Sequence, residues 1–311
     1  MTTITRREWA AIVGGGLVVG PLASLRAQEC GAAGDAMGQA ARSIVAGVRI
    51  GAQSYSFRDR PLEQVPAAFE AAGLNFCELW SGHVEAPGLI GATSDTPRDQ
   101  RRALTRTWRL GVPMSHFEAI GRSFSDAGVT VTSYDVPYRD DWTDEEIARS
   151  FEMAKALGVS VITSSAVVSV VPRLAPYAEK ARIKVSFHNH STIKANEFAT
   201  PDDFAAAMKV SPMMGATLDI GHFTAANFDA VEYLQKHHAR INALHIKDRR
   251  RDQGPNVPFG EGDTPIVAVL RLVRDRKWDI PAHIEYEYEG GDTVAEVAKC
   301  YAYCRQAFET A

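Results

Sequence analysis

The heptapeptide Ala216-Thr-Leu-Asp-Ile-Gly-His222 is the stretch around which the rest of the chain can be arranged. Residues 214–220 form a short apolar run typical of a buried strand, and Asp219 places a carboxylate at the carboxyl end of that run. A glycine then allows the chain to turn, and His222 follows three residues after the aspartate. Taken alone, the motif is explained equally well by a strand-ending aspartate that caps the next helix.

Three neighbouring apolar runs also end in metal-ligand or proton-transfer residue types. They are Val185-Ser-Phe-His-Asn-His190, Ala243-Leu-His-Ile-Lys-Asp248 and Ala282-His-Ile-Glu-Tyr-Glu287. The carboxyl ends of consecutive parallel strands in a barrel meet at one face, where barrel enzymes carry their active sites. Four such endings in a row therefore predict a metal site, and two imidazoles with one Asp and one Glu suit Mn, Co, Zn or Fe better than Ca.

The pattern of strand, loop and helix repeats from residue 48 to the end of the chain. The expected strands are 49–57, 74–80, 112–120, 159–165, 184–190, 214–220, 241–247 and 280–286, and the expected helices are 61–72, 97–110, 143–157, 172–181, 200–209, 229–240, 264–276 and 293–309. Several strands are nearly continuous apolar runs, as parallel strands covered on both faces should be. The sequence thus predicts an α/β fold with a single (β/α)8 TIM barrel, and a doubly wound sheet is the alternative.

The first residues have the order of an export signal. Arg6 and Arg7 precede a Gly-rich apolar run, residues 10–25, and Ala27 offers a small residue for cleavage. The paired arginines indicate the twin-arginine type. A membrane anchor is the alternative, but a run of about 16 residues with four Gly and a Pro is short for a spanning helix. We expect a cleaved signal peptide at 1–27, a spacer at 28–47 and the barrel at 48–311.

The net charge argues against a nucleic-acid partner, and the cysteines argue against a disulfide-stabilised fold. The net charge is −4, and it becomes −6 once residues 1–27, which carry three Arg and one Glu, are removed. An acidic protein has no electrostatic footprint for nucleic acid. Four cysteines without a regular spacing indicate no disulfide framework. We expect a periplasmic or secreted protein that is free of the membrane after cleavage, and a homo-oligomer is compatible with the sequence.

Residues 48–309 resemble the xylose-isomerase-like barrels, a family of sugar isomerases and epimerases that includes endonuclease IV. The resemblance is carried by Leu218-Asp-Ile-Gly-His222, His245-Ile-Lys-Asp248, Phe259-Gly-Glu-Gly-Asp263 and Ile284-Glu-Tyr-Glu287. It implies one divalent ion, of uncertain identity, held by His188, Asp219, His245 and Glu285. It also implies that His222 faces the substrate.

The chain departs from the family pattern at His188, where the epimerases carry a Glu that is both ligand and acid/base. An imidazole can bind the metal, but a ligated imidazole is a poor proton acceptor. The Phe187-His-Asn-His190 form resembles the barrels that dehydrate keto-inositols or cleave 3-keto-glycosides by elimination. Glu285 is then the candidate base, and the candidates for the acid are His222, Lys247 and Glu78.

These features favour a metal-dependent isomerase or epimerase that acts on a sugar or keto-sugar through an enediolate. The alternatives are a lyase or dehydratase that eliminates from a 3-keto-glycoside or keto-inositol, and an inactive barrel that only binds sugar. A small carbohydrate is the expected partner. Polar and aromatic side chains near the expected strand ends are its candidate binding residues, namely His190, Trp80, His83, Tyr55, His116 and Asp248.

Replacing both Arg6 and Arg7 by Lys tests the proposed export route. The paired arginines are the feature that distinguishes a twin-arginine signal, so unprocessed precursor should accumulate in the cytoplasm. Fractionation and immunoblotting of the native and the substituted protein measure this. Normal processing and periplasmic recovery of the double variant would contradict the assignment.

Overall fold

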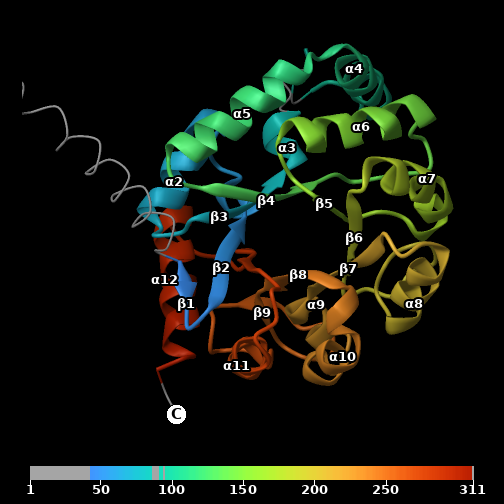
Figure 1. Ribbon diagram of the computed structural model, residues 1–311. Coiled ribbons are helices and arrows are strands. Elements are labelled where there is room, and N and C mark those ends of the chain that lie inside the picture. The colour runs from blue at the N-terminus through green and yellow to red at the C-terminus, as the bar shows by residue number, and fades with distance from the viewer. Residues whose placement is uncertain (1–42, 86–90, 94, 310–311) are drawn as a thin grey trace, which may run out of the picture. The chain divides into compact units, whose positions relative to one another are not determined.

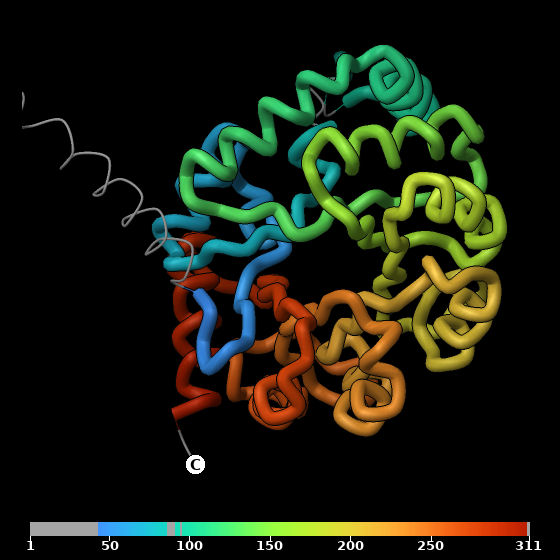
Figure 2. Tube along the Cα trace, viewed as in Figure 1, coloured from blue at the N-terminus to red at the C-terminus, as the bar shows by residue number. Residues whose placement is uncertain are grey.

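Eight parallel strands close into a barrel (Figures 1 and 2). The computed structural model describes residues 43–85, 91–93 and 95–309, so the expected signal peptide and the spacer up to residue 42 lie outside the described residues. In chain order each barrel strand pairs with the next, and the last pairs with the first, which confirms the predicted barrel. The strands are β2 (Val48–Gln53), β3 (Phe76–Trp80), β4 (Thr130–Asp135), β5 (Val161–Ser164), β6 (Lys184–His188), β7 (Met214–Asp219), β8 (Ile241–Ile246) and β11 (Ala282–Ile284).

Helices surround the barrel and follow most of the strands (Figure 1). The longer ones are α2 (Val65–Ala71), α4 (Arg98–Gly111), α5 (Met114–Asp126), α6 (Asp144–Ala156), α7 (Val171–Ala181), α8 (Pro201–Val210), α10 (Ala230–His237), α11 (Ile266–Arg276) and α12 (Thr293–Gln306). Thr143 and Thr200 each begin a helix with a reciprocal capping box, which satisfies backbone N–H groups of the first turn. Within the part of the chain that the structure describes, no helix is long and apolar enough to cross a membrane.

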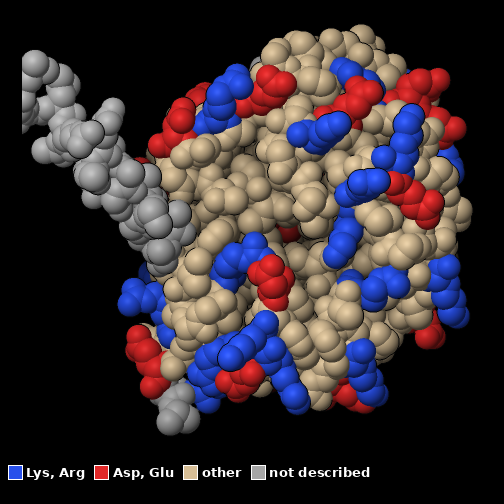
Figure 3. All heavy atoms as spheres, in the orientation of Figure 1, with Lys and Arg blue, Asp and Glu red and all other residues tan. Residues whose placement is uncertain are grey.

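Several short elements lie before or after the barrel strands. The pair β9 (Asp248–Arg249) and β10 (Asn256–Val257) forms a small antiparallel ribbon after β8, and β1 (Ile44–Val45) pairs antiparallel with β2. Two single-turn helices, α3 (Ser81–Val84) and α9 (Ile220–Ala225), follow β3 and β7, and four short 3-10 turns are Ser54–Phe57, Leu62–Gln64, Val168–Val170 and His238–Arg240. On the face in Figure 3, basic and acidic side chains are interspersed, and acidic atoms are visible at the bottom of a central hollow.

The core lies inside the strands and between the strands and helices. All six residues of β7 are buried, and Ile50, Leu218 and Ile246 are fully enclosed in three different strands. Burial on both faces explains why these strands are apolar runs rather than alternating patterns.

The predicted strand at 112–120 is wrong. Residues 114–120 lie in α5, and the third barrel strand is β4, which lies between the expected strand at 112–120 and the expected helix at 143–157. Phe117, Ile120 and Phe124 are buried on α5 at the spacing of a helix face, whereas β4 has the mostly polar sequence Thr-Val-Thr-Ser-Tyr-Asp. The apolar signal therefore belonged to the helix, and the strand end at Asp135 was missed.

Candidate metal and active site

Asp219 caps a helix with one carboxylate oxygen and directs the other toward the neighbouring strand ends. Its Oδ1 accepts the backbone N–H of His222 at 2.7 Å and so caps α9. Its Oδ2 lies 3.2 Å from Nε2 of His188. The side-chain amide of Asn189 bonds to both the N–H and the C=O of Asp219, at 3.0 and 3.1 Å. The helix cap and the amide thus hold the second carboxylate oxygen toward the other strand ends.

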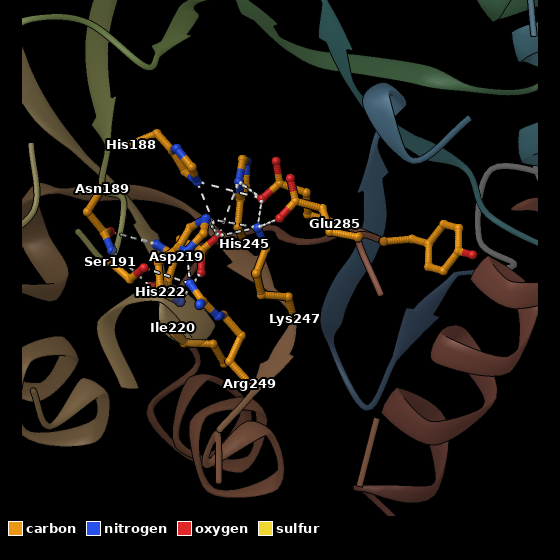
Figure 4. Close-up of polar contacts among 12 residues, drawn as sticks. His188, Asn189, Ser191, Asp219, Ile220, His222, His245, Lys247, Arg249 and Glu285 are labelled. Atoms are coloured by element: carbon orange, nitrogen blue, oxygen red, sulfur yellow. Dashed lines mark hydrogen bonds and ion pairs between the residues drawn. The ribbon is translucent and has the colours of Figure 1, made fainter. Parts of the chain in front are cut away.

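Four ligand-type side chains meet at the ends of four consecutive barrel strands (Figure 4). Each of His188, Asp219, His245 and Glu285 offers one atom, and these atoms all lie within 4.8 Å of one another. Nδ1 of His245 is 3.1 Å from Oε2 of Glu285, and Nε2 of His188 is 3.6 Å from the same oxygen. All four side chains are buried. The structure thus brings together the whole set that the sequence suggested as metal ligands.

The carboxylates of this cluster attract positive charge, which suits a cation-binding site. Burial and the nearby His245 charge would lower the pKa of His188, but the carboxylates of Asp219 and Glu285 outweigh them and raise it to about 9. Burial likewise works against the charged form of His245, yet Glu78 and Glu285 raise its pKa well above the usual value. The carboxylates therefore hold protons on both rings. Two nitrogen and two oxygen donors fit Mn, Co, Zn or Fe, and a bound ion would replace those protons.

Glu78 lies behind His245 and outside the cavity lining. Its Oε1 is 2.9 Å from Nε2 of His245, and its Oε2 is 3.3 Å from Nδ1 of His283. The side chain is only 1% exposed. A carboxylate on the far nitrogen of an imidazole fixes the ring so that the other nitrogen faces the ligand set. The geometry therefore makes Glu78 a positioning residue, in place of the acid expected from the sequence.

A cavity of about 270 Å³ opens over the cluster. Three of the predicted substrate residues, Tyr55, Trp80 and His190, line it together with His222 and Glu285. The rings of Tyr55 and Trp80 meet edge to face with centroids 5.0 Å apart. The remaining lining residues are Gln53, Asp135, Ser165, His188 and Glu287. Aromatic rings beside many hydrogen-bonding groups suit a small polyhydroxylated ligand.

Two predicted substrate residues, His83 and His116, have structural environments instead. His83 is buried, and its ring nitrogens lie near Ser54 Oγ at 3.0 Å and the carbonyl of Phe57 at 3.3 Å. His116 lies on α5, where its ring packs against Trp108 at a centroid distance of 5.9 Å. The expectation for His116 depended on the wrong strand at 112–120. Neither residue lines the cavity.

Asp248 organises the loop that follows β8 rather than lining the cavity. Its Oδ2 accepts the backbone N–H groups of Gly260 and Gly262, and its Oδ1 accepts that of Thr264. A Cβ on Gly262 would lie 2.0 Å from this carboxylate, so the glycine is needed for the close approach. The Phe259-Gly-Glu-Gly-Asp263 motif is therefore a loop anchored on Asp248.

His222 and Lys247 lie side by side at the edge of the cluster (Figure 4). Nε2 of His222 is 3.1 Å from Nζ of Lys247, and its Nδ1 is 2.7 Å from Nη1 of Arg249. Burial and the charge of Lys247 lower the pKa of His222 well below its usual value. The ring is therefore neutral and can donate or accept a hydrogen bond. Lys247 is only 2% exposed and does not line the cavity.

Asp135 is the functional candidate that the sequence analysis missed. It ends β4, lines the cavity, and accepts a hydrogen bond from Nε2 of Gln53 at 3.2 Å on Oδ2. Burial, with the charge of Glu78 as the next cause, raises the pKa of Asp135 to about 8. Burial would also raise the pKa of Glu285, but Lys247 and His245 lower it well below its usual value. The cavity thus combines one protonated and one ionised carboxyl group at neutral pH, a pairing typical of acid/base catalysis.

Comparison with known proteins identifies the family and the fold. A family model described as "xylose isomerase-like TIM barrel" matches residues 66–304. No curated protein matches the chain. Among solved structures, a sugar phosphate isomerase/epimerase from Parabacteroides distasonis is 20% identical with a TM-score of 0.59, and the match covers 83% of this chain and 93% of that one.

Two further solved structures share the fold at lower identity. The IolI protein with a zinc atom is 14% identical with a TM-score of 0.63, over 85% of this chain and 100% of that one. A probable 3-DHS dehydratase, AsbF of Bacillus anthracis, is 14% identical with a TM-score of 0.60, over 82% and 98% of the two chains. At these identities the likeness shows the fold.

Metal analysis of single variants tests the four-residue ligand set. Removal of one ligand leaves three donors, so Asp219→Ala and His245→Ala should each bind Mn²⁺ more than about 100-fold more weakly than the native protein. Equilibrium dialysis followed by elemental analysis measures this. His116→Ala, which removes an imidazole from α5, is the matched control and should bind like the native protein. Full metal retention by both ligand variants would show that the site is misassigned.

Asp135→Asn tests the protonated carboxyl group through stability. The folded pKa of about 8 exceeds the unfolded value near 4, so the folded state holds a proton that the unfolded state has lost. Stability should therefore fall as the pH rises from about 4 to about 8, and Asn, which mimics the protonated form, should remove this loss. The melting temperature of the metal-free variant should exceed that of the native protein by roughly 2 °C or more at pH 8.

The matched control for this experiment is Asp126→Asn, because Asp126 is exposed on α5. Its melting temperature should follow that of the native protein across the pH range. A difference between Asp135→Asn and the native protein that does not grow with pH would contradict the protonated state of Asp135.

Proposed function

The chain belongs to the xylose isomerase-like TIM barrel family, and from this premise we propose that it is a divalent-metal-dependent isomerase or epimerase acting on a sugar or keto-sugar through an enediolate. The observation that carries the proposal is the convergence of His188, Asp219, His245 and Glu285 beneath a cavity lined by aromatic and polar side chains. A barrel that only binds sugar would have no need for this buried donor set, which is costly to keep charged.

The four converging residues would hold the metal ion. When bound, the ion would polarise a substrate carbonyl and lower the barrier to proton removal from the neighbouring carbon. Glu78 keeps Nδ1 of His245 directed at the donor set, while Asn189 fixes the backbone of Asp219 and the N–H of His222 holds its carboxylate. The protein thus fixes the donors before any ligand arrives.

Proton transfer falls to the carboxyl groups in the cavity. Glu285 is ionised and can accept the proton from the acidic carbon. Gln53 donates to Oδ2 of Asp135, which leaves Oδ1 as the oxygen that carries the proton and can deliver it. Glu285 follows β11 and Asp135 ends β4, and two other strands separate these in the barrel, so the two groups approach a ligand from different sides of the barrel mouth.

Uncharged groups provide the remaining recognition. Burial and the charge of His188 lower the pKa of His190 to about 4, so its ring is neutral and suits a sugar hydroxyl. Tyr55 and Trp80 offer aromatic surface to the apolar side of a sugar ring.

Elimination from a 3-keto-glycoside or keto-inositol is the second candidate, and His188 favours it. A nitrogen that binds metal cannot also accept a proton, so this strand end lacks the second base that an epimerase uses. Elimination needs one base and one acid. Glu285 would take the proton as the C–H bond breaks, the electron pair would form the C=C bond, and the C–O bond would break as Asp135 protonates the departing oxygen.

Export completes the proposal. We propose that the mature enzyme acts in the periplasm or outside the cell, on the support of Arg6, Arg7 and the apolar run that follows. Loading the metal before transport would suit a twin-arginine route, because that route carries folded proteins.

Proton NMR in deuterated water distinguishes the candidate reactions. The metal-loaded protein is incubated with free ketoses and with 3-keto-glycosides or keto-polyols. An isomerase or epimerase introduces deuterium at the rearranged carbon, whereas a lyase yields an unsaturated product or a released leaving group. Deuterium at the rearranged carbon of a free ketose would support the isomerase or epimerase proposed here, whereas faster elimination from the keto-glycoside, which His188 favours, would support the second candidate. Sugar binding without turnover of either class would leave the barrel a binding protein.

The variant His188→Glu links this result to one residue. A Glu at this strand end restores a ligand that also transfers protons, so the ratio of epimerisation to elimination should rise. The metal content of the variant is the control. Loss of metal without a change in this ratio would contradict the role assigned to residue 188.

A further inference from the structure

The ammonium group of Lys247 is buried and surrounded by hydrogen-bond acceptors. Its Nζ is 2.8 Å from Oε2 of Glu285, 3.2 Å from Oδ2 of Asp219 and 2.5 Å from Oε2 of Glu287. Nε2 of His222 is 3.1 Å away. Because the side chain is only 2% exposed and does not line the cavity, it has no direct access to a substrate. This lysine is therefore a fixed internal cation.

Three of those acceptors form a second set of metal-ligand atoms. The donor atoms of His222, Glu285 and Glu287 lie within 4.8 Å of one another, and Nζ of Lys247 contacts a donor atom of each. Glu285 belongs to both sets, since its Oε2 is also 3.1 Å from Nδ1 of His245. Two adjacent cation sites thus share the carboxylate of Glu285, and the ammonium group fills one of them.

We propose that Lys247 occupies a second cation site and thereby limits each chain to one divalent ion. The inference rests on the proposed metal site at His188, Asp219, His245 and Glu285. In the native protein, one divalent ion and one ammonium group balance the three negative charges of Asp219, Glu285 and Glu287. Replacing Lys247 by a small neutral residue leaves one of those charges uncompensated in a half-buried site, which attracts a second ion.

The chain is built to hold the ammonium group in this place. A Cβ on Gly221 would lie 2.3 Å from Cγ of Lys247 and 2.8 Å from its carbonyl oxygen. The glycine of the Leu218-Asp-Ile-Gly-His222 motif is therefore needed for the lysine stem to pass. Within this motif, Asp219 is a proposed metal ligand, Gly221 leaves room for the side chain of Lys247, and His222 contacts Nζ of Lys247.

His222 sets the strength of the second site. Arg249 lies 2.7 Å from Nδ1 of His222 on the side opposite Lys247, and a neutral imidazole can accept a hydrogen bond through only one nitrogen. An ion on Nε2 requires the proton on Nδ1, where it meets the guanidinium group. The second ion in a Lys247 variant should therefore bind about tenfold or more weakly than the first.

Titration with Mn²⁺ alone, without any substrate, tests the proposal. The native protein, Lys247→Ala and the charge-preserving Lys247→Arg are dialysed against rising Mn²⁺ and analysed for bound metal, with electron paramagnetic resonance to detect coupling between paired ions. We expect one ion in the native protein and in Lys247→Arg, and two spin-coupled ions in Lys247→Ala. The double variant Lys247→Ala/Glu287→Gln should return to one ion, because it lacks a ligand of the second site.

The outcomes separate this inference from the proposed function. No bound ion in the native protein would overturn the metal-dependent function. One ion in both the native protein and Lys247→Ala, or two ions in the native protein, would overturn the role of Lys247 and leave the function intact. Lys247→Gln is the second neutral variant, in case Lys247→Ala does not fold. Failure of both to fold at any Mn²⁺ concentration would also count against the proposal, which requires that an ion can replace the ammonium group.

Discussion

Buried carboxylates at the mouth of the barrel must be neutralised, and much of the site follows from this requirement. Asp219, Glu285 and Glu78 are each at most 6% exposed, and an isolated ionised carboxylate at such burial is very costly. Cationic or protonated groups lie at contact distance from these carboxylates. Lys247 contacts Asp219 and Glu285, and His245 contacts Glu285 and Glu78. Among the described residues, Asp135 has no cationic group at contact distance and keeps its proton instead. The same electrostatic requirement thus accounts for the ionised and the protonated carboxyl groups.

The barrel makes this concentration of charge possible by confining it to one end. Along β7 the side chains up to Leu218 belong to a tightly packed interior, and the carboxylate comes only at the last residue. The same order holds in β6, where Val185 and Phe187 are fully buried before His188. Apolar burial along the strands stabilises the fold, at roughly 25 cal/mol per Å², and offsets the cost of polar groups at the strand ends. Because parallel strands all end on one face of the barrel, the fold itself brings those groups together, although they lie far apart in the sequence.

This division explains which features could be predicted from the sequence. The apolar runs of β6, β7 and β8 carry both the strand signal and ligand-type residues at their ends, so the fold and a metal site at this face could be predicted together. The choice of His188, Asp219, His245 and Glu285 among those residues came from the family resemblance. β4 has a polar sequence and lies next to a helix with a strong apolar face, so its end at Asp135 could not be predicted. Sequence position also says nothing of contact partners. For that reason the sequence suggests Glu78 as a catalytic acid and Asp248 as a substrate-binding residue, although Glu78 orients His245 and Asp248 holds a loop.

Ligand-type residues and cavity-lining aromatic residues therefore differ in what their substitution would disturb. A residue such as Asp219 is fixed by several simultaneous contacts, because it caps α9, faces His188 and is held by Asn189. Its replacement disturbs a helix start, a ligand set and a charge balance together. Tyr55 and Trp80 line the cavity and contact each other, so their replacement alters the shape of the pocket above an unchanged set of donors. Specificity for one carbohydrate or another is thus separable from most of the chemistry at the bottom of the cavity. Of the four ligand-type residues, His188 and Glu285 belong to both, since they also form part of the cavity wall.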